Sequence, residues 1–215
     1  SSRVKTEFPG ISPPKTTAAG RFEGVLPILW RRLADKNGDN ISPVAKTKFS
    51  DVPAYAWYSG YVKYLNNNGV TYGHSKTIFA PDEQITRAEF TTMAVRFFDV
   101  YGDGDAEIME QFKSFDDVSD GYWAAEYIKA AAKHGWITGY GDGSFRADRQ
   151  ITRAEVVTIV NRLLGREADL DYVSDNLRKL NTFPDVSRRY WAYSDILEAA
   201  NTHNAILGTE ESWYK

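Results

Sequence analysis

The chain has 215 residues, of which 42% are hydrophobic and 26% charged, which is enough apolar material for a packed core. It contains no cysteine, and this excludes a disulfide framework, a thiolate metal site and a cysteine nucleophile. The net charge of −3, without a tract of Lys or Arg, argues against nucleic acid as a main partner. No apolar run approaches the ~20 residues that a transmembrane helix needs, so membrane insertion is not expected, and no signal peptide is visible.

The N-terminal part of the chain is predicted to hold an arm and one helix. Residues 1–20 contain three prolines and few periodic apolar residues, which is typical of a surface loop or an ordered arm. A helix is expected over about residues 22–34, although Pro27 favours a later start.

A polar linker is expected over residues 35–48. Its first residues, Asp35-Lys36-Asn37-Gly38-Asp39, are similar to the opening of a calcium loop. An EF-hand loop requires Gly at its sixth position and a bidentate acid at its twelfth, where this chain has Asn40 and Lys46. The linker interpretation is therefore favoured over a calcium site, and no metal site is predicted.

Two segments in the middle of the chain repeat the same motifs. Phe-x-Asp-Val begins at Phe49 and again at Phe115, and Ile-Thr-Arg-Ala-Glu begins at Ile85 and again at Ile151, both at an offset of 66 residues. A Trp follows the Phe of each Phe-x-Asp-Val motif eight residues later. Several anchors at one offset indicate an internal duplication.

Each unit is expected to fold as helix, loop and helix. The first helix begins near the Trp and ends before Gly69 or Gly135, because glycine suits the residue that follows a helix. A loop rich in turn-forming residues follows, which in the second unit runs from Gly139 to Phe145. The second helix begins at the Thr of Thr-Arg-Ala-Glu, which is Thr86 or Thr152.

The two ends of the chain hold halves of a third unit. Phe183-Pro184-Asp185-Val186 and Trp191 repeat the signature of the first helix, while the N-terminal helix matches the second, with Arg31 at the position of Arg96 and Arg162. We expect the N-terminal helix to complete the C-terminal half-unit, since one unit cannot bury its apolar face alone. The predicted fold is mainly α, with three pseudo-equivalent helix-loop-helix repeats closed into a pseudo-threefold bundle. The expected boundaries are an arm with a partial repeat over 1–48, repeats over 49–114 and 115–182, the latter with a polar linker from Arg166 to Leu180, and a partial repeat over 183–215.

These ordered motifs resemble the S-layer homology family. The two central units match nearly in full and the terminal halves match partly. The resemblance implies a bacterial surface module of three repeats that holds proteins on the cell wall without covalent bonds. It also implies that the usual ligand is a secondary cell-wall polysaccharide, often with pyruvate ketals, bound in grooves between repeats, and that the Arg of Thr-Arg-Ala-Glu is a main contact. The expected location is the extracellular cell wall or S-layer of a bacterium, with surface-layer proteins as further candidate partners.

The chemistry of Thr-Arg-Ala-Glu can be considered without a ligand. Thr86 with Glu89, and Thr152 with Glu155, form the pattern of a capping box. Capping does not explain the Arg between them, because a cation is disfavoured at a helix N-terminus. Two interpretations remain: the Arg grips an anionic ligand together with free helix amides, or it forms a salt bridge, for example to the Asp of Phe-x-Asp-Val.

The other repeated residues also allow two interpretations. The Trp residues would either pack in the core or form groove walls that stack on sugar rings. Each Asp of Phe-x-Asp-Val is expected to cap a turn or orient an Arg, and the loop glycines are expected to serve loop geometry. In the N-terminal half-unit, Arg21-Phe22-Glu23-Gly24 lacks the motif Arg and Glu, so a third groove is expected to be weak or altered. The candidate ligand-binding residues are Arg87, Arg153, Glu89, Glu155, Trp57, Trp123, Trp191, Asp51, Asp117, Asp185, Gly139 and Gly141.

Catalysis finds little support in the sequence. The three His residues form no metal-ligand spacing, and no pair of carboxylates stands out as the acid and nucleophile of a glycosidase. We therefore predict a non-enzymatic wall anchor that needs no cofactor. The alternative is a protein–protein assembly module of the surface layer that uses the same grooves.

Overall fold

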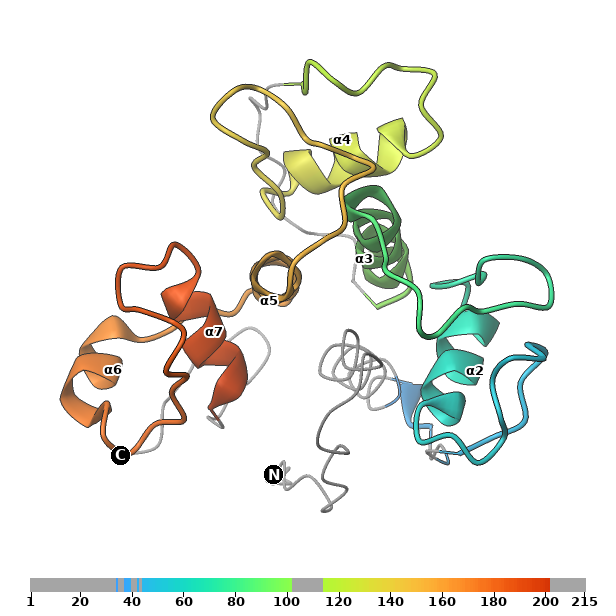
Figure 1. Cartoon of the computed structure of the whole chain (residues 1–215), viewed down its shortest axis with the longest axis horizontal. Helices are drawn as coiled ribbons and strands as arrows, with labels where there is room; N and C mark the ends of the chain where they lie inside the picture. The colour runs from blue at the N-terminus through green and yellow to red at the C-terminus, as the bar shows by residue number, and fades with distance from the viewer. Residues whose placement is uncertain (1–33, 35–36, 40–41, 43, 102–113, 202–215) are drawn as a thin grey trace.

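The computed structural model describes residue 34, residues 37–39, residue 42, and residues 44–101 and 114–201. These residues form helices and no strand, as the predicted mainly α fold requires. In Figure 1, α3 and α5 lie near the middle of the molecule, and α2, α4 and α7 lie outside them. The helices are α2 (Ser59–Asn67), α3 (Arg87–Tyr101), α4 (Ala125–Lys133), α5 (Arg153–Leu163), α6 (Leu170–Asn176) and α7 (Tyr193–Ala200).

The second helix of each central unit begins where the capping box places it. Thr152 Oγ1 accepts a hydrogen bond from the amide of Glu155, and the Glu155 carboxylate accepts one from the amide of Thr152 at 2.8 Å. Thr86 and Glu89 exchange the same two bonds at the start of α3. The reciprocal capping satisfies amides that a helix start leaves unpaired, so the predicted starts at these Thr residues are confirmed.

The first helix of each unit is shorter than expected but ends as predicted. Helices α2 and α4 begin two residues after Trp57 and Trp123, respectively. Gly69 and Gly135 follow them with φ of 75° and 69°, the left-handed conformation in which a glycine ends a helix without strain.

The loop between the two helices folds back over the Phe of Phe-x-Asp-Val. In the second unit, Asp117 accepts hydrogen bonds from the amides of Phe145 and Arg146, both at 2.7 Å. Asp51 does the same for Phe79 and Ala80 in the first unit. Desolvation is the largest single effect on Asp51 and raises its pKa. The backbone hydrogen bonds together outweigh desolvation, so the pKa of Asp51 lies below its ordinary value. The motif Asp therefore fixes the loop, as the turn-capping expectation proposed.

A substitution in this loop gives a stability prediction with an internal control. Gly139 has φ of 67°, and a Cβ there would run into the Phe115 ring, whereas a Cβ on Gly141 meets nothing within 4 Å. Gly139→Ala is expected to lower the free energy of unfolding by about 2 kcal/mol, because it adds backbone strain to a steric clash. Gly141→Ala is expected to change it by less than about 0.5 kcal/mol. Urea denaturation of both variants would test this, and equal stability of the two would contradict it.

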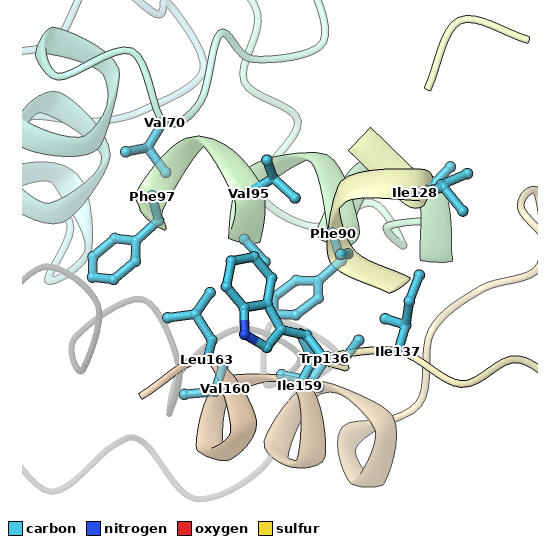
Figure 2. Close-up of a cluster of buried hydrophobic side chains, with 14 of the residues drawn as sticks. Val70, Phe90, Val95, Phe97, Ile128, Trp136, Ile137, Ile159, Val160 and Leu163 are labelled. Atoms are coloured by element: carbon cyan, nitrogen blue, oxygen red, sulfur yellow. The ribbon is translucent and has the colours of Figure 1, made fainter. Parts of the chain in front are cut away.

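One hydrophobic core joins the two central repeats. Phe90 and Phe97 of α3, Ile159 of α5 and Ile128 of α4 are all at most 4% exposed. Trp136, which follows α4, reaches in among side chains of α3 and α5 (Figure 2) and packs against Phe98 with ring centroids 4.7 Å apart. Because this core spans both units, the start of α3 and the loop before α5 are held against each other.

The C-terminal part differs from the sequence prediction in one element. The stretch from Arg166 to Leu180 was expected to be a polar linker, but it contains helix α6. Asp169 caps this helix by accepting from the amide of Tyr172, and Val173 is buried in a small cluster with Ala168 and Leu197. The predicted N-terminal helix over 22–34, and with it the closure of the three-lobed ring, lies outside the described residues apart from Ala34, so both remain predictions.

Candidate functional site: the junction and groove between the central repeats

The start of α3 is covered by the loop of the following repeat. The amides of Arg87 and Ala88 donate to the carbonyl oxygens of Arg149 and Ala147, at 2.9 and 3.0 Å. Thr86 and Gln150 form an isolated antiparallel β-bridge beside these bonds. The expectation of free amides at this helix start is wrong for α3, because a neighbouring loop takes the bonds that an anion would have accepted.

The Arg87 side chain is buried in the same junction, with 7% of its surface exposed. Its Nη1 lies 2.8 Å from Glu155 Oε1, and its Nε donates to the carbonyl oxygen of Phe145 at 2.8 Å. The guanidinium also lies over the rings of Tyr140 and Phe145, 5.0 and 4.6 Å from their centroids. Arg87 is therefore held in an internal ion pair between the two repeats.

The Glu155 carboxylate is the acidic partner of the cationic side chains in this cluster. Its Oε1 also accepts from the Tyr140 hydroxyl at 2.8 Å and pairs with Arg149, while its Oε2 caps α5. Desolvation raises the pKa of Glu155, but the bonds from Thr152, Tyr140 and Arg149 and the charge of Arg87 outweigh it and lower the pKa to about 2. The carboxylate is ionised at neutral pH and serves as the common acceptor of the junction.

The two motif arginines occupy different environments. Arg87 has the salt-bridge arrangement that the sequence left as an alternative, with Glu155 as partner rather than the Asp of Phe-x-Asp-Val. Arg153 is exposed at the start of α5. It borders a hollow of about 250 Å³ that Gln84 and Gln150 also line. Of the two arginines, Arg153 is the one accessible from outside.

A larger groove, of about 280 Å³, runs between the first and second repeats. Trp57 of the first unit and Trp123 of the second both line it, together with the loop from Thr71 to Ile85. Helix α3 contributes four residues to the groove, spaced three or four positions apart, so they lie on one face of the helix. These side chains are Glu89, Thr92, Met93 and Arg96.

The structure separates the alternatives for the Trp residues. Trp123 is 57% exposed and Trp191 is 58% exposed, so the core-packing alternative is wrong for both. Trp57 is half-buried and packs edge-on against Tyr61 with centroids 6.0 Å apart. An indole that keeps more than half of its surface in water, beside a groove, is available to stack on a flat apolar ligand face.

Apart from Glu89, the remaining predicted site residues do not line this groove. Asp117 and Gly139 shape the second loop, and no close neighbour restricts Gly141. Asp185 is exposed in the C-terminal unit. Glu89 does line the groove, with its Oε2 on Thr86.

Sequence reasoning missed three of the groove's polar residues, His74, Asp82 and Glu83. His74 and Glu83 do not recur at the offset of 66 residues, where Tyr140 and Arg149 stand, so only their position in the folded loop identifies them. Asp82 recurs as Asp148, and that recurrence is a signal that could have found it. Arg96 was noted as a shared position with Arg31 and Arg162, and that recurrence is the signal that could have placed it in the site.

In the part of the chain that the structure describes, no group of His, Asp or Glu is arranged to hold a metal ion. Within that same part, every helix is too short or too polar to cross a bilayer.

Comparison with known proteins places this junction in context. Residues 48–91 and 114–157 match the S-layer homology domain. Cell surface glycoprotein 1 of Acetivibrio thermocellus is 35% identical over 170 residues, which cover 76% of this chain and 7% of that protein. The cellulosome-anchoring protein of the same organism is 30% identical over 179 residues, covering 82% of this chain and 38% of that protein. The S-layer protein sap of Bacillus anthracis is 35% identical over 122 residues, covering 56% and 14%. The chain thus spans well under half of the length of each of these relatives.

Proposed function

Because two repeats of this chain belong to the S-layer homology family, we propose that it is a non-catalytic module that anchors a surface protein to the bacterial cell wall. The names of its relatives, a cellulosome-anchoring protein and an S-layer protein among them, support this function and a location at the cell surface. The proposed ligand is a secondary cell-wall polysaccharide that carries an acidic substituent such as a pyruvate ketal.

The observation that carries the proposal is the groove between Trp57 and Trp123. Its volume of about 280 Å³ is just below the range of about 300 to 1,000 Å³ for drug-sized ligands, which suits one or two sugar residues of a polymer. The exposed indole of Trp123 offers a flat face for the C–H face of a sugar ring, with the half-buried Trp57 beside the same groove. The carboxylates of Asp82, Glu83 and Glu89 offer acceptors for the hydroxyl groups of the sugar. The groove lies between repeats, where the resemblance expects a ligand.

Arg153 supplies a cation outside this groove. Its exposed position at the start of α5 suits a contact with an acidic group of a polymer that passes over the surface. Arg87 has its charge matched by Glu155, so the proposed binding does not depend on it.

Retention on purified cell-wall sacculi would test the anchoring function. Trp123→Ala is expected to weaken retention about 5- to 10-fold, since one stacking contact is lost. Trp191→Ala is the matched control, because it removes an indole of equal exposure that does not line this groove. Undiminished retention of the Trp123 variant would contradict the assignment of the groove.

The same experiment separates anchoring from protein assembly. Sacculi from which the acidic polymer has been extracted are expected to retain none of the protein. If retention persists on the stripped sacculi, or if the protein forms concentration-dependent oligomers without any polymer, the groove serves protein–protein contacts and the anchoring proposal fails.

A further inference from the structure

The position that Met93 occupies on α3 carries isoleucine in the other repeats. Ile159 stands at the equivalent position of α5, at the offset of 66 residues, and Ile28 stands there in the N-terminal half-unit when Arg31 is aligned with Arg96. Isoleucine and methionine fill similar volumes, so packing alone does not require a thioether at this position. The exchange makes the first repeat chemically distinct, because a thioether sulfur is readily oxidised and an isoleucine side chain is not.

The surroundings of the two positions also differ. Ile159 is 4% exposed and lies within the core that joins the central repeats. Met93 is half-buried, since it packs against the same core but also lines the groove between Trp57 and Trp123. An oxidant that enters the groove therefore meets the Met93 side chain from one side, because core residues cover the other.

Sulfur chemistry in this chain is restricted to methionine. The chain has no cysteine and two methionines, Met93 and Met109, the second of which lies outside the described residues. A location at the cell wall means that hydrogen peroxide in the surrounding medium reaches the protein without crossing a membrane. Peroxide converts methionine into methionine sulfoxide, which is a common oxidative change in proteins.

We propose that Met93 is a peroxide-oxidation site and that its sulfoxide weakens binding in the groove. The lone pair of Sγ attacks one oxygen of hydrogen peroxide, and the S–O bond forms as the O–O bond breaks. The second oxygen leaves as hydroxide, which takes the proton of the transferred oxygen and becomes water. The sulfur is oxidised by two electrons and the peroxide is reduced. The effect on binding rests on the proposed function, whereas the site of oxidation does not.

The added oxygen places a strong hydrogen-bond acceptor on a side chain that was apolar. Arg96 stands three positions further along α3, on the same helical face, and also lines the groove. Its guanidinium lies 4.7 Å from the ring centroid of Tyr72 and 5.0 Å from that of Tyr127. We expect the sulfoxide oxygen to accept a hydrogen bond from Arg96, which draws the guanidinium away from these rings and fills part of the groove.

Peptide mapping by mass spectrometry tests the site of oxidation. The protein is treated with dilute hydrogen peroxide, either folded or unfolded in urea, and the sulfoxide of the Met93 peptide is measured over time. The folded protein is expected to react within about 10-fold of the rate of the unfolded chain, since exposure controls susceptibility. A sulfur sealed in the core would react only after unfolding, more than about 1,000-fold more slowly, and this result would overturn the proposal.

The stereochemistry of the sulfoxide gives a second test. Attack from the groove places the oxygen on one side of the sulfur, so one sulfoxide epimer is expected to predominate in the folded protein. The unfolded chain is expected to give both epimers in similar amounts. Methionine sulfoxide reductases A and B each reduce one epimer, so their action on the isolated Met93 peptide measures the ratio. Equal amounts from the folded protein would contradict attack from the groove.

Retention on sacculi tests the effect on binding, with each variant compared before and after peroxide. Oxidation is expected to lower the retention of the original protein and of Met109→Leu by about 3- to 10-fold. Met93→Ile, which carries the residue of the other repeats, is expected to lose this response to peroxide. The proposal fails if Met93→Ile responds as strongly as the original protein, or if full oxidation of Met93 leaves retention unchanged. Absence of retention before peroxide would count against the proposed function alone, and the oxidation rate and epimer ratio would still decide whether Met93 is the site.

Discussion

Replacing Arg87 with Ala is expected to lower the free energy of unfolding by about 3 kcal/mol at neutral pH. The substitution leaves the Glu155 carboxylate partly buried without its closest partner from the first repeat, although Arg149 and Tyr140 still contact it. It also opens a gap beside Phe145, whose carbonyl oxygen loses the Nε donor. Urea denaturation at pH 7, followed by circular dichroism, measures the loss.

Arg153→Ala is the control for this variant, since it makes the same change at the same motif position of the next repeat. Arg153 is exposed, so its replacement is expected to change the stability by less than about 1 kcal/mol. Its effect is expected in retention on sacculi. Equal stability losses in the two variants would mean that the junction with Glu155 contributes little to the fold, and that the burial of Arg87 has no structural importance.

Two groups of residues explain how much of the fold could be predicted from the sequence. The second helices were predictable because Thr86 and Thr152 act locally: a capping box needs only residues within one turn. The loop clamp at Asp117 was also predictable, since its partners follow at a fixed distance along the chain. Features that repeat in sequence and act within one unit are those that pattern analysis finds.

The different roles of Arg87 and Arg153 could not be predicted from the motif. Both stand in the same four residues, and the difference arises from what the next repeat places beside them. Arg87 meets Glu155 across 68 positions of sequence. A local pattern carries no information about such a contact, because it depends on how two repeats pack.

Helix α6 was missed for a related reason. It is seven residues long, and only Val173 is buried, so it has no recurring apolar face. Its signal was the Asp169 cap alone, and one cap in a polar stretch is also typical of a turn. The C-terminal cluster with Leu197 stabilises a helix that the sequence pattern does not favour over a linker.

The stability of the junction is expected to fall in acid, with Glu155 as the responsible group. Its pKa in the folded chain is about 2, against an ordinary value of 4.5. Because folding lowers this pKa, the ionised carboxylate contributes its full stabilisation above about pH 4.5, and that contribution is lost as the pH falls toward about 2. The size of the pKa shift corresponds to about 3 kcal/mol, most of it between pH 4.5 and 2.

Glu155→Gln tests this assignment, because the amide cannot ionise and leaves Arg87 without its charge partner. At pH 7 the variant is expected to be less stable than the original protein by about 3 kcal/mol, and the difference is expected to shrink as the pH is lowered to 3. Glu89→Gln is the matched control at the same motif position, where the carboxylate is exposed and caps the helix beside Thr86. It is expected to keep the acid dependence of the original protein. A stability difference for Glu155→Gln that stays constant from pH 7 to pH 3 would show that another carboxylate controls the acid sensitivity, since only a group that titrates in this range can make the two curves converge.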